Sequence, residues 1–190
     1  MGNYIARIVV NLENPDIFYV ASDLGIVRTT DFGNTYETII SGYWCTDLVM
    51  RSDSPSVLIA ALSGYGLLRT SDGGDSWQNL TAGLPTSGFG RINLAISQSN
   101  PDVAYASFVS SADYSLLGMY RTDDGGDSWS YLSNTPNYLG SQGFYDNCLY
   151  VDPSDPYTIY AGGVWPYDEN TAGLIKSTDG GVTWTDITIG

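Results

Sequence analysis

The sequence predicts an all-β protein made of four consecutive four-stranded antiparallel sheets, and three observations lead to this prediction. An eight-residue motif occurs four times within the 190 residues. Four short runs of apolar and β-branched residues accompany each copy in the same order. The composition, with 22 glycines, 15 tyrosines and 15% charged residues, suits short strands and tight turns better than helices.

The eight-residue motif reads Ser/Thr-x-Asp-x-Gly-x-Ser/Thr-aromatic and occupies residues 29–36, 70–77, 122–129 and 177–184. Its aspartate can accept backbone N–H groups just after it, its glycine permits a positive φ, and its aromatic ring can pack on the sheet. We therefore expect structural roles, in hairpin turns, for Asp31, Gly33, Asp72, Gly74, Trp77, Asp124, Gly126, Trp129, Asp179, Gly181 and Trp184.

The strands follow from the runs around each motif. First strands are expected at 7–12, 47–51, 92–97 and 148–152, and after a turn with proline the second at 17–21, 57–61, 103–107 and 158–161. Third strands lead into the motif at 25–28, 66–69, 118–121 and 173–176, and fourth strands follow at 36–40, 77–80, 129–132 and 184–187.

Repeats of four strands at this length are typical of a β-propeller. Successive motif aspartates are 41, 52 and 55 residues apart. We predict a single propeller module over residues 1–190, with blades at about 4–42, 43–83, 84–135 and 136–190.

The repeats differ in length because certain loops are longer in some repeats than in others. The extra residues lie between second and third strands (109–117 and 164–172) and between blades (81–90 and 133–145). In an up-and-down blade these loops share one face, opposite the motif turns. Function is expected on elaborated loops carried by a rigid scaffold, so this face is the predicted binding face.

Aromatic and acidic residues are frequent in these loops. The rings are Tyr43, Trp44, Tyr65, Phe89, Tyr114, Tyr138, Phe144, Tyr145, Trp165 and Tyr167, and the acids are Asp23, Asp47, Asp113, Asp146, Asp168 and Glu169. Rings that stack on sugars beside hydroxyl-binding acids favour a polysaccharide site, with Trp44, Tyr65, Tyr114, Tyr145, Trp165 and Tyr167 as substrate-binding residues. The alternative, that individual rings pack between blades, is equally compatible with the sequence.

The charge, the composition and the motif spacing of the sequence argue against several classes of function. A net charge of −14, from 21 acidic residues against seven basic ones, argues against nucleic acid as a partner. The absence of histidine excludes Ser-His-Asp catalysis and histidine metal sites. No cofactor or metal is predicted; acidic loops can hold Ca²⁺, but no EF-hand-like spacing occurs. No run is long enough to span a membrane.

The two cysteines, Cys45 and Cys148, lie far apart and in no metal-ligand spacing. They could pair in an oxidising compartment, but the sequence gives no geometry for a disulfide. We expect two free and largely buried thiols.

With motifs and loops taken together, the whole chain resembles the BNR or Asp-box repeat propellers. That group includes sialidases, xyloglucan-degrading glycosidases, sortilin-type receptors and photosystem II assembly factors. The stretch 140–147, followed by Val151-Asp152-Pro153 and Ala161-Gly162-Gly163, resembles large secreted bacterial proteins identified as glycosidases. The resemblance implies a secreted, carbohydrate-facing protein whose leader is absent from this chain.

Two differences between this sequence and members of the family argue against sialidases and against the assembly factors. A sialidase needs three arginines for its substrate carboxylate, and only Arg7, Arg51 and Arg91 lie outside the repeat positions. The assembly factors are typically more basic on their working surface, so this acidic chain fits them poorly as well.

In the xyloglucan-degrading enzymes two aspartates face each other across a cleft, and the matching positions here are approximately Asp146 and Asp47. The resemblance thus implies, for an enzyme, a glycoside hydrolase using this pair.

We expect either a carbohydrate-binding module of a glycosidase-like protein, or a non-catalytic scaffold that binds proteins or assembles with itself. Three arrangements of the blades stay open: part of a longer propeller, a half that pairs with a second copy to make eight blades, and a closed ring of four. An open end would expose an apolar blade face and sheet edges, which favours pairing.

Overall fold

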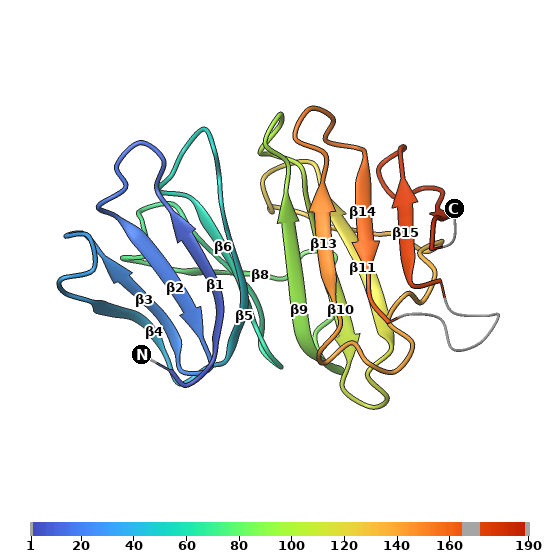
Figure 1. Cartoon of the computed structure of the whole chain (residues 1–190), viewed down its shortest axis with the longest axis horizontal. Coiled ribbons are helices and arrows are strands. Elements are labelled where there is room, and N and C mark those ends of the chain that lie inside the picture. Colours follow the sequence, from blue (N-terminus) through green and yellow to red (C-terminus); the bar gives the residue numbers. More distant parts are fainter. Residues whose placement is uncertain (1, 165–171, 189–190) are drawn as a thin grey trace. The chain divides into compact units, whose positions relative to one another are not determined.

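The computed structural model describes residues 2–164 and 172–188. Two predicted sugar-binding residues, Trp165 and Tyr167, therefore lie outside the described residues, as do Asp168 and Glu169. The described part of the chain contains sixteen strands, which form four four-stranded sheets (Figure 1). The predicted all-β fold of four antiparallel blades is confirmed.

Each blade uses four consecutive strands. Blade 1 consists of β1 (Ile5–Val10), β2 (Phe18–Ser22), β3 (Gly25–Thr29) and β4 (Glu37–Ser41). Blade 2 consists of β5 (Cys45–Met50), β6 (Leu58–Leu62), β7 (Gly66–Thr70) and β8 (Gln78–Leu80). Blade 3 consists of β9 (Phe89–Ile96), β10 (Ala104–Ser110), β11 (Leu116–Thr122) and β12 (Ser130–Tyr131). Blade 4 consists of β13 (Cys148–Val151), β14 (Ile159–Gly162), β15 (Leu174–Ser177) and β16 (Thr185–Asp186).

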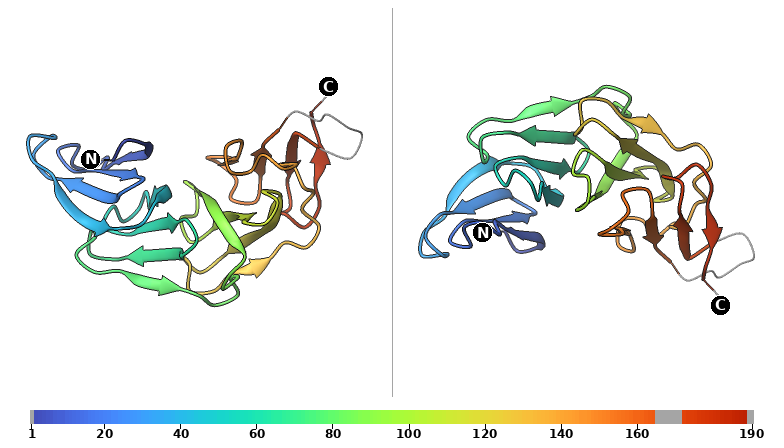
Figure 2. Two further views of the ribbon diagram at one scale, coloured as in Figure 1. Left: turned by 90° about the horizontal axis from the view of Figure 1, so that it is seen from below. Right: turned by 90° about the horizontal axis from the view of Figure 1, so that it is seen from above.

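The chain divides into two compact units. Unit 1 covers residues 1–80 with blades 1 and 2, and unit 2 covers residues 81–190 with blades 3 and 4. In unit 1, β1 contacts β5; in unit 2, β9 lies beside β13 and runs in the same direction (Figure 1). Figure 2 shows from below and from above how the two sheets of each unit lie against each other. That the whole chain is one propeller module stays a prediction.

The core of each unit lies between its two blades. In unit 1 it includes Tyr19, Ala21 and Ile26 of blade 1 and Leu48, Leu58 and Ala60 of blade 2. In unit 2 it includes Ala95, Tyr105 and Met119 of blade 3 and Val151, Ile159, Ala161 and Ile175 of blade 4. Alternate residues of each strand face the neighbouring blade, as a two-residue strand period requires. Burial of these apolar side chains holds the paired blades together.

Hydrogen bonds at the rim of this core join blade 1 to blade 2. The Tyr19 hydroxyl and Arg28 Nη1 both donate to the Gly73 carbonyl, at 3.0 and 2.9 Å. Arg28 Nη1 also pairs with Asp75 Oδ1 at 2.7 Å. Gly73 and Asp75 belong to the motif of blade 2, so this motif also serves as the acceptor for the preceding blade.

Blade 3 is joined to blade 4 in the same way. Arg121 Nη1 donates to the Gly180 carbonyl in the motif of blade 4, at 2.9 Å. The Tyr105 hydroxyl donates to the Pro156 carbonyl at 2.9 Å. Burial raises the pKa of Tyr105, so its hydroxyl stays a donor at all ordinary pH values.

The motif itself is a compact hydrogen-bonded turn, illustrated by blade 3. Thr122 Oγ1 donates to Asp124 Oδ1 at 2.7 Å and accepts the N–H of Gly126 at 2.9 Å. Asp124 accepts the N–H and the hydroxyl of Ser128, at 2.9 and 2.6 Å. The same bonds recur around Asp31, Asp72 and Asp179. The aspartate therefore closes on the residue four positions later, and the first Ser/Thr satisfies the glycine N–H.

The closing tryptophans secure the motif turns to their own blades. Nε1 of Trp77 and Trp184 donates to the carbonyls of Gly74 and Gly181, at 3.1 Å in both cases. Trp129 is buried. Gly33, like the other motif glycines at this position, has a positive φ.

The motif aspartates have lowered pKa values, and we therefore predict that the protein loses stability in acid. Bonds from Ser128 and Thr122 lower the pKa of Asp124 to about 2, and bonds from Thr183 and Ser177 lower that of Asp179 to about 2. An unfolded aspartate has a pKa of about 3.9, so below that pH the unfolded chain binds more protons than the folded one. The contribution of these two aspartates to the free energy of unfolding is fully present above pH 4 and is lost as the pH falls towards 2.

Melting temperatures from circular dichroism between pH 5 and pH 2 should therefore fall. Ser128→Ala removes the principal cause of the Asp124 shift. We expect this variant to start less stable at pH 5 and to lose less on acidification. Equal slopes for the two proteins would contradict this account of the motif.

The two ends of each blade differ. Motif turns and proline turns share one end, where the N–H groups of Phe32, Gly73, Gly125 and Gly180 donate to the carbonyls of Asp16, Ser56, Asp102 and Tyr157. At the other end, connections between strands and between blades bond to each other. We call this other end the loop edge; it comprises residues 22–25, 41–45 and 62–66 in unit 1, and 110–115 and 133–147 in unit 2.

Candidate functional site

Three exposed aromatic rings gather on the loop edge of unit 2. Tyr114, Phe144 and Tyr145 are 48%, 47% and 67% exposed. The ring centroids of Tyr114 and Phe144 lie 5.0 Å apart at 60°, and those of Phe144 and Tyr145 lie 6.5 Å apart. Aromatic side chains that stay exposed beside one another form a continuous apolar surface for a ligand.

The backbone at Tyr114 is held in an uncommon conformation. Its φ is +61°, a value that non-glycine residues seldom adopt and that costs about 1–2 kcal/mol. The Tyr114 carbonyl accepts the N–H of Gly143 at 2.9 Å, which joins the β10–β11 loop to the segment before β13. A neighbouring turn, in which Asp113 accepts the N–H and hydroxyl of Ser115 at 3.1 and 2.8 Å, also holds the loop.

A buried polar triad of Ser107, Tyr138 and Asn147 anchors the segment before β13. The Ser107 and Tyr138 hydroxyls are 2.7 Å apart, Tyr138 donates to Asn147 Oδ1 at 3.0 Å, and Asn147 Nδ2 donates to Ser107 at 3.2 Å. All three residues are at most 7% exposed. Because Ser107 belongs to β10 and Asn147 directly precedes β13, the triad fixes the position of the segment that carries Tyr145 and Asp146.

Arg91 fixes the same segment from β9. Its Nη1 donates to the carbonyls of Phe144 and Tyr145, at 3.1 and 2.9 Å, and its Nε donates to Asn93 Oδ1 at 2.9 Å. The arginine is therefore engaged in positioning the aromatic segment.

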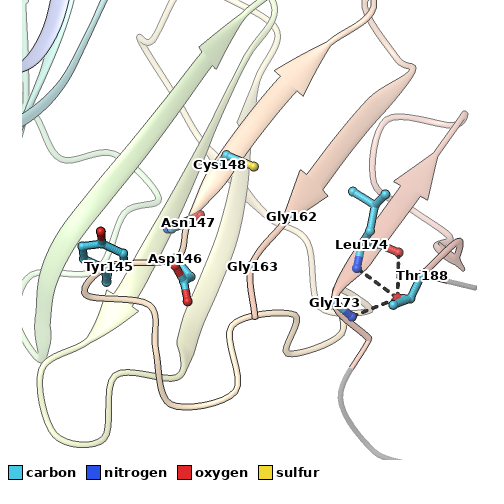
Figure 3. A pocket seen from close by; sticks show the side chains of 9 residues that line it. All are labelled: Tyr145, Asp146, Asn147, Cys148, Gly162, Gly163, Gly173, Leu174 and Thr188. Atoms are coloured by element: carbon cyan, nitrogen blue, oxygen red, sulfur yellow. Dashed lines mark hydrogen bonds between the residues drawn. The ribbon is translucent and has the colours of Figure 1, made fainter. Parts of the chain in front are cut away.

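Asp146 lies beside the rings, at one side of a pocket. The pocket has a volume of about 520 Å³ and is lined by Tyr145, Asp146, Asn147, Cys148, Gly162, Gly163, Gly173, Leu174 and Thr188 (Figure 3). Asp146 is half-buried, and its carboxylate has no hydrogen bond or ion pair with the part of the chain that the structure describes. A half-buried carboxylate at a pocket beside exposed rings can accept hydroxyl groups of a ligand.

A second group of exposed rings lies on the loop edge of unit 1. Tyr43, Trp44 and Tyr65 are 41%, 42% and 46% exposed. Tyr43 and Tyr65 lie 4.8 Å apart, and Trp44 meets Tyr4 at 6.5 Å. Each unit thus presents predicted sugar-binding rings on its own loop edge.

Asp47 has a different environment from Asp146. Arg7 of blade 1 donates to Asp47 of blade 2 through Nε at 2.7 Å and Nη2 at 3.2 Å. Asp47 is 1% exposed and also accepts the N–H of Leu48 at 2.9 Å. The hydrogen bond between the Arg7 and Asp47 side chains raises the pKa of Arg7. The arrangement gives Asp47 a structural function between the blades, and its catalytic function stays a prediction.

The two predicted catalytic aspartates also hold different places in the repeat. Asp47 faces Ala61 in the β5–β6 pairing, whereas in the corresponding β13–β14 pairing Cys148 faces Gly162. Asp146 therefore stands two residues earlier in its blade than Asp47 does. The two carboxylates belong to different units, and the paired-aspartate mechanism stays untested.

Two of the aromatic residues in the predicted loops are buried, and one cysteine that we expected to be buried is exposed. Phe89 and Tyr138 are 5% and 0% exposed, so these two rings pack inside unit 2. Both cysteines are free, as expected, but Cys148 is exposed, so its predicted burial was wrong. Burial raises the pKa of the Cys45 thiol to about 12, which makes it unreactive.

Sequence reasoning did not find the residues that position the site. Ser107, Asn147 and Arg91 act through contacts with residues 31 to 54 positions away, and no motif marks them. Within the described residues no group of three acidic or cysteine side chains is placed to hold a metal ion. No helix among them is long and apolar enough to cross a membrane.

The four sheets, their strand order and the repeated motif define a β-propeller domain. The sequence matches the DUF6242 β-propeller domain over residues 7–189, and the chain belongs to this family. Among curated proteins, no sequence matches it.

Solved structures with a similar fold include two carbohydrate-active enzymes. A GH74 xyloglucanase from Xanthomonas campestris has a TM-score of 0.72 at 18% identity, covering 94% of this chain and 29% of that one. An ancestral GH74 enzyme has a TM-score of 0.70 at 18% identity, covering 98% and 26%.

YCF48 from Cyanidioschyzon merolae has a TM-score of 0.59 at 19% identity, covering 96% of this chain and 55% of that one. At these identities the likeness concerns the fold alone. The chain spans between 26% and 55% of the length of these three proteins.

Proposed function

We propose that the loop edge of unit 2 binds a neutral polysaccharide, and that the domain comes from a secreted protein related to glycoside hydrolases. The observation that carries the proposal is the cluster of exposed Tyr114, Phe144 and Tyr145 rings beside the half-buried carboxylate of Asp146. Rings of this kind can stack on the C–H faces of sugars, and the carboxylate can accept their hydroxyls.

The architecture around the cluster favours a binding site over a packing surface. The triad of Ser107, Tyr138 and Asn147 and the clamp from Arg91 hold the segment rigidly, while its aromatic side chains remain outside the core. A fixed aromatic surface loses little conformational freedom when it binds.

The charge of the chain favours a neutral glycan. With a net charge of −14, the domain repels polyanions such as pectate or heparin. The fold likeness to the GH74 enzymes supports plant-type β-glucans as the first substrates to test. For catalysis, Asp146 is the candidate acid or base.

Affinity gel electrophoresis with xyloglucan tests the site. We expect Tyr145→Ala and Asp146→Asn each to weaken retardation about tenfold, the effect of losing one central contact. Tyr131→Ala is the matched control, because Tyr131 is 57% exposed but lies on the outermost strand of blade 3. No retardation by any neutral glycan, or equal losses in all three variants, would refute the proposal.

A second candidate function is protein binding without catalysis. The observation that favours it is the exposure of apolar side chains on the blade faces, such as Ile8 at 55% and Tyr150 at 57%. Reducing-sugar release that disappears in Asp146→Asn would support the hydrolase, whereas a stable protein complex without glycan binding would support the scaffold.

A further inference from the structure

The pairing register shows which residues are equivalent in the repeats. Tyr19 faces Arg28 in blade 1, and Tyr105 faces Arg121 in blade 3. The corresponding pair in blade 4 is Tyr160 and Lys176. Lys176 Nζ lies 5.3 Å from the centre of the Tyr160 ring, so the two side chains are together.

In blades 1 and 3 the face of the sheet that carries this tyrosine and arginine is covered by the next blade of the same unit. There the tyrosine and the arginine donate to carbonyls of the next blade, Gly73 in unit 1, and Pro156 and Gly180 in unit 2. Both tyrosines are at most 3% exposed. A blade with this pair is thus built to receive another blade.

The same face of blade 4 is exposed. Tyr150 is 57% exposed, whereas its equivalent Ala95 in blade 3 is 7% exposed. Leu174 is 40% exposed, whereas its equivalent Met119 is fully buried. We call this surface, with Tyr150, Tyr160, Leu174 and Lys176, the donor face.

Blade 1 has the complementary exposed surface on its other side. Ile8 and Val10 of β1 are 55% and 42% exposed. The equivalent of Ile8 in blade 2 is Leu48, which is fully buried against blade 1. The equivalent of Val10 in blade 4 is Val151, which is 5% exposed because blade 3 covers it. We call the surface with Ile8 and Val10, together with the motif turn at Phe32, the acceptor face.

We propose that the donor face of one copy of this chain packs on the acceptor face of a second copy. Tyr160 and Lys176 then donate to the carbonyl of Phe32, the residue that matches Gly73 and Gly180. The contact continues, between copies, the blade-to-blade interface seen twice within the chain. This inference goes beyond the proposed polysaccharide site and rests on Tyr150, Tyr160 and Lys176. Leu174 belongs to both surfaces, because it also lines the pocket beside Asp146.

The two faces depart from the repeat at Phe32 and at Lys176. A Cβ at Gly180 would lie 2.1 Å from Arg121 Nη1, so the end of this flexible side chain would have to shift. Phe32 carries a side chain at the equivalent position, at a φ of +61°, and is 69% exposed. Its proposed donor is a lysine, whose single ammonium nitrogen is slimmer than a guanidinium group. At Gly73 a Cβ would lie 3.8 Å from Arg28 Nη1, an ordinary contact, and 3.2 Å from Tyr19 Oη, which would have to move by a few tenths of an ångström.

Light scattering on a gel-filtration column tests the proposal. We expect the wild-type protein to have a measured mass of two or more times the 20.5 kDa of one chain. Ile8→Glu on the acceptor face and Lys176→Glu on the donor face should each give monomers. Val182→Glu is the matched control for Ile8→Glu: both residues are 55% exposed, and Val182 lies on the motif turn of blade 4. It should assemble normally.

Mixing the two monomeric variants provides the decisive outcome. Since the interface joins two different faces, a mixture of Ile8→Glu and Lys176→Glu contains one intact pair of faces and should form a heterodimer. A monomeric wild type, including one closed within a single chain, would overturn the proposal. So would assembly that survives both variants, or a failure of the mixture to associate while circular dichroism shows both variants folded. Retardation by xyloglucan reports separately on Tyr145 and Asp146.

Discussion

Arg7→Met will lower the free energy of unfolding of unit 1 by about 2–3 kcal/mol, since removing one partner of a buried ion pair leaves the other charge costly to bury. Asp47 is 1% exposed, and Arg7 supplies two of its hydrogen bonds. Arg7 itself is 45% exposed, which places the effect at or below the low end of the range for buried pairs. Urea unfolding followed by circular dichroism measures it.

Asp47→Asn and the double variant complete this experiment. The double variant should lose less stability than the sum of the two single variants, because the interaction can be lost only once. Additive losses would contradict the ion pair. If Asp47→Asn weakens stability but leaves any glycan hydrolysis intact, Asp47 is a structural residue and the catalytic pair has to be sought elsewhere.

Thr122→Val is expected to destabilise unit 2 by about 2 kcal/mol, although the two side chains have nearly the same shape. The Thr122 hydroxyl donates to Asp124 and accepts the N–H of Gly126. Thr122 is 1% exposed, so valine leaves the buried Gly126 N–H without its acceptor. The unfolding midpoint in urea reports the loss.

Thr122→Ser is the control for this change. Serine keeps the hydroxyl, and Ser177 makes the same bonds in the motif of blade 4. We expect the serine variant to stay within about 1 kcal/mol of the wild type, the cost of a lost buried methyl group. If valine and serine variants are equally stable, the hydroxyl does not support the turn.

The fold could be predicted because its determinants are local and repeated. Each motif closes through bonds between residues two to four positions apart, for example Thr122 with Asp124 and Gly126. Four copies of one local pattern also fixed the strand order, since every strand pairs with its neighbour along the chain.

The candidate site could be predicted only in part. Exposed rings such as Trp44, Tyr65, Tyr114 and Tyr145 were found from their position in elaborated loops. Burial of Tyr138 and the pairing of Asp47 with Arg7 depend on contacts across blades, between residues up to 40 positions apart. Local patterns do not contain such contacts, so a buried tyrosine and an exposed one look alike in the sequence.

The most direct test of the proposed polysaccharide site is a titration of ¹⁵N-labelled protein with a xyloglucan oligosaccharide, followed by NMR. We predict that the amide signals of Tyr114, Phe144, Tyr145 and Asp146 shift in proportion to occupancy, while those of the motif turns at Asp31, Asp72 and Asp124 do not. Shifts confined to the motif turns, or no shifts with any neutral oligosaccharide, would contradict binding at the loop edge of unit 2.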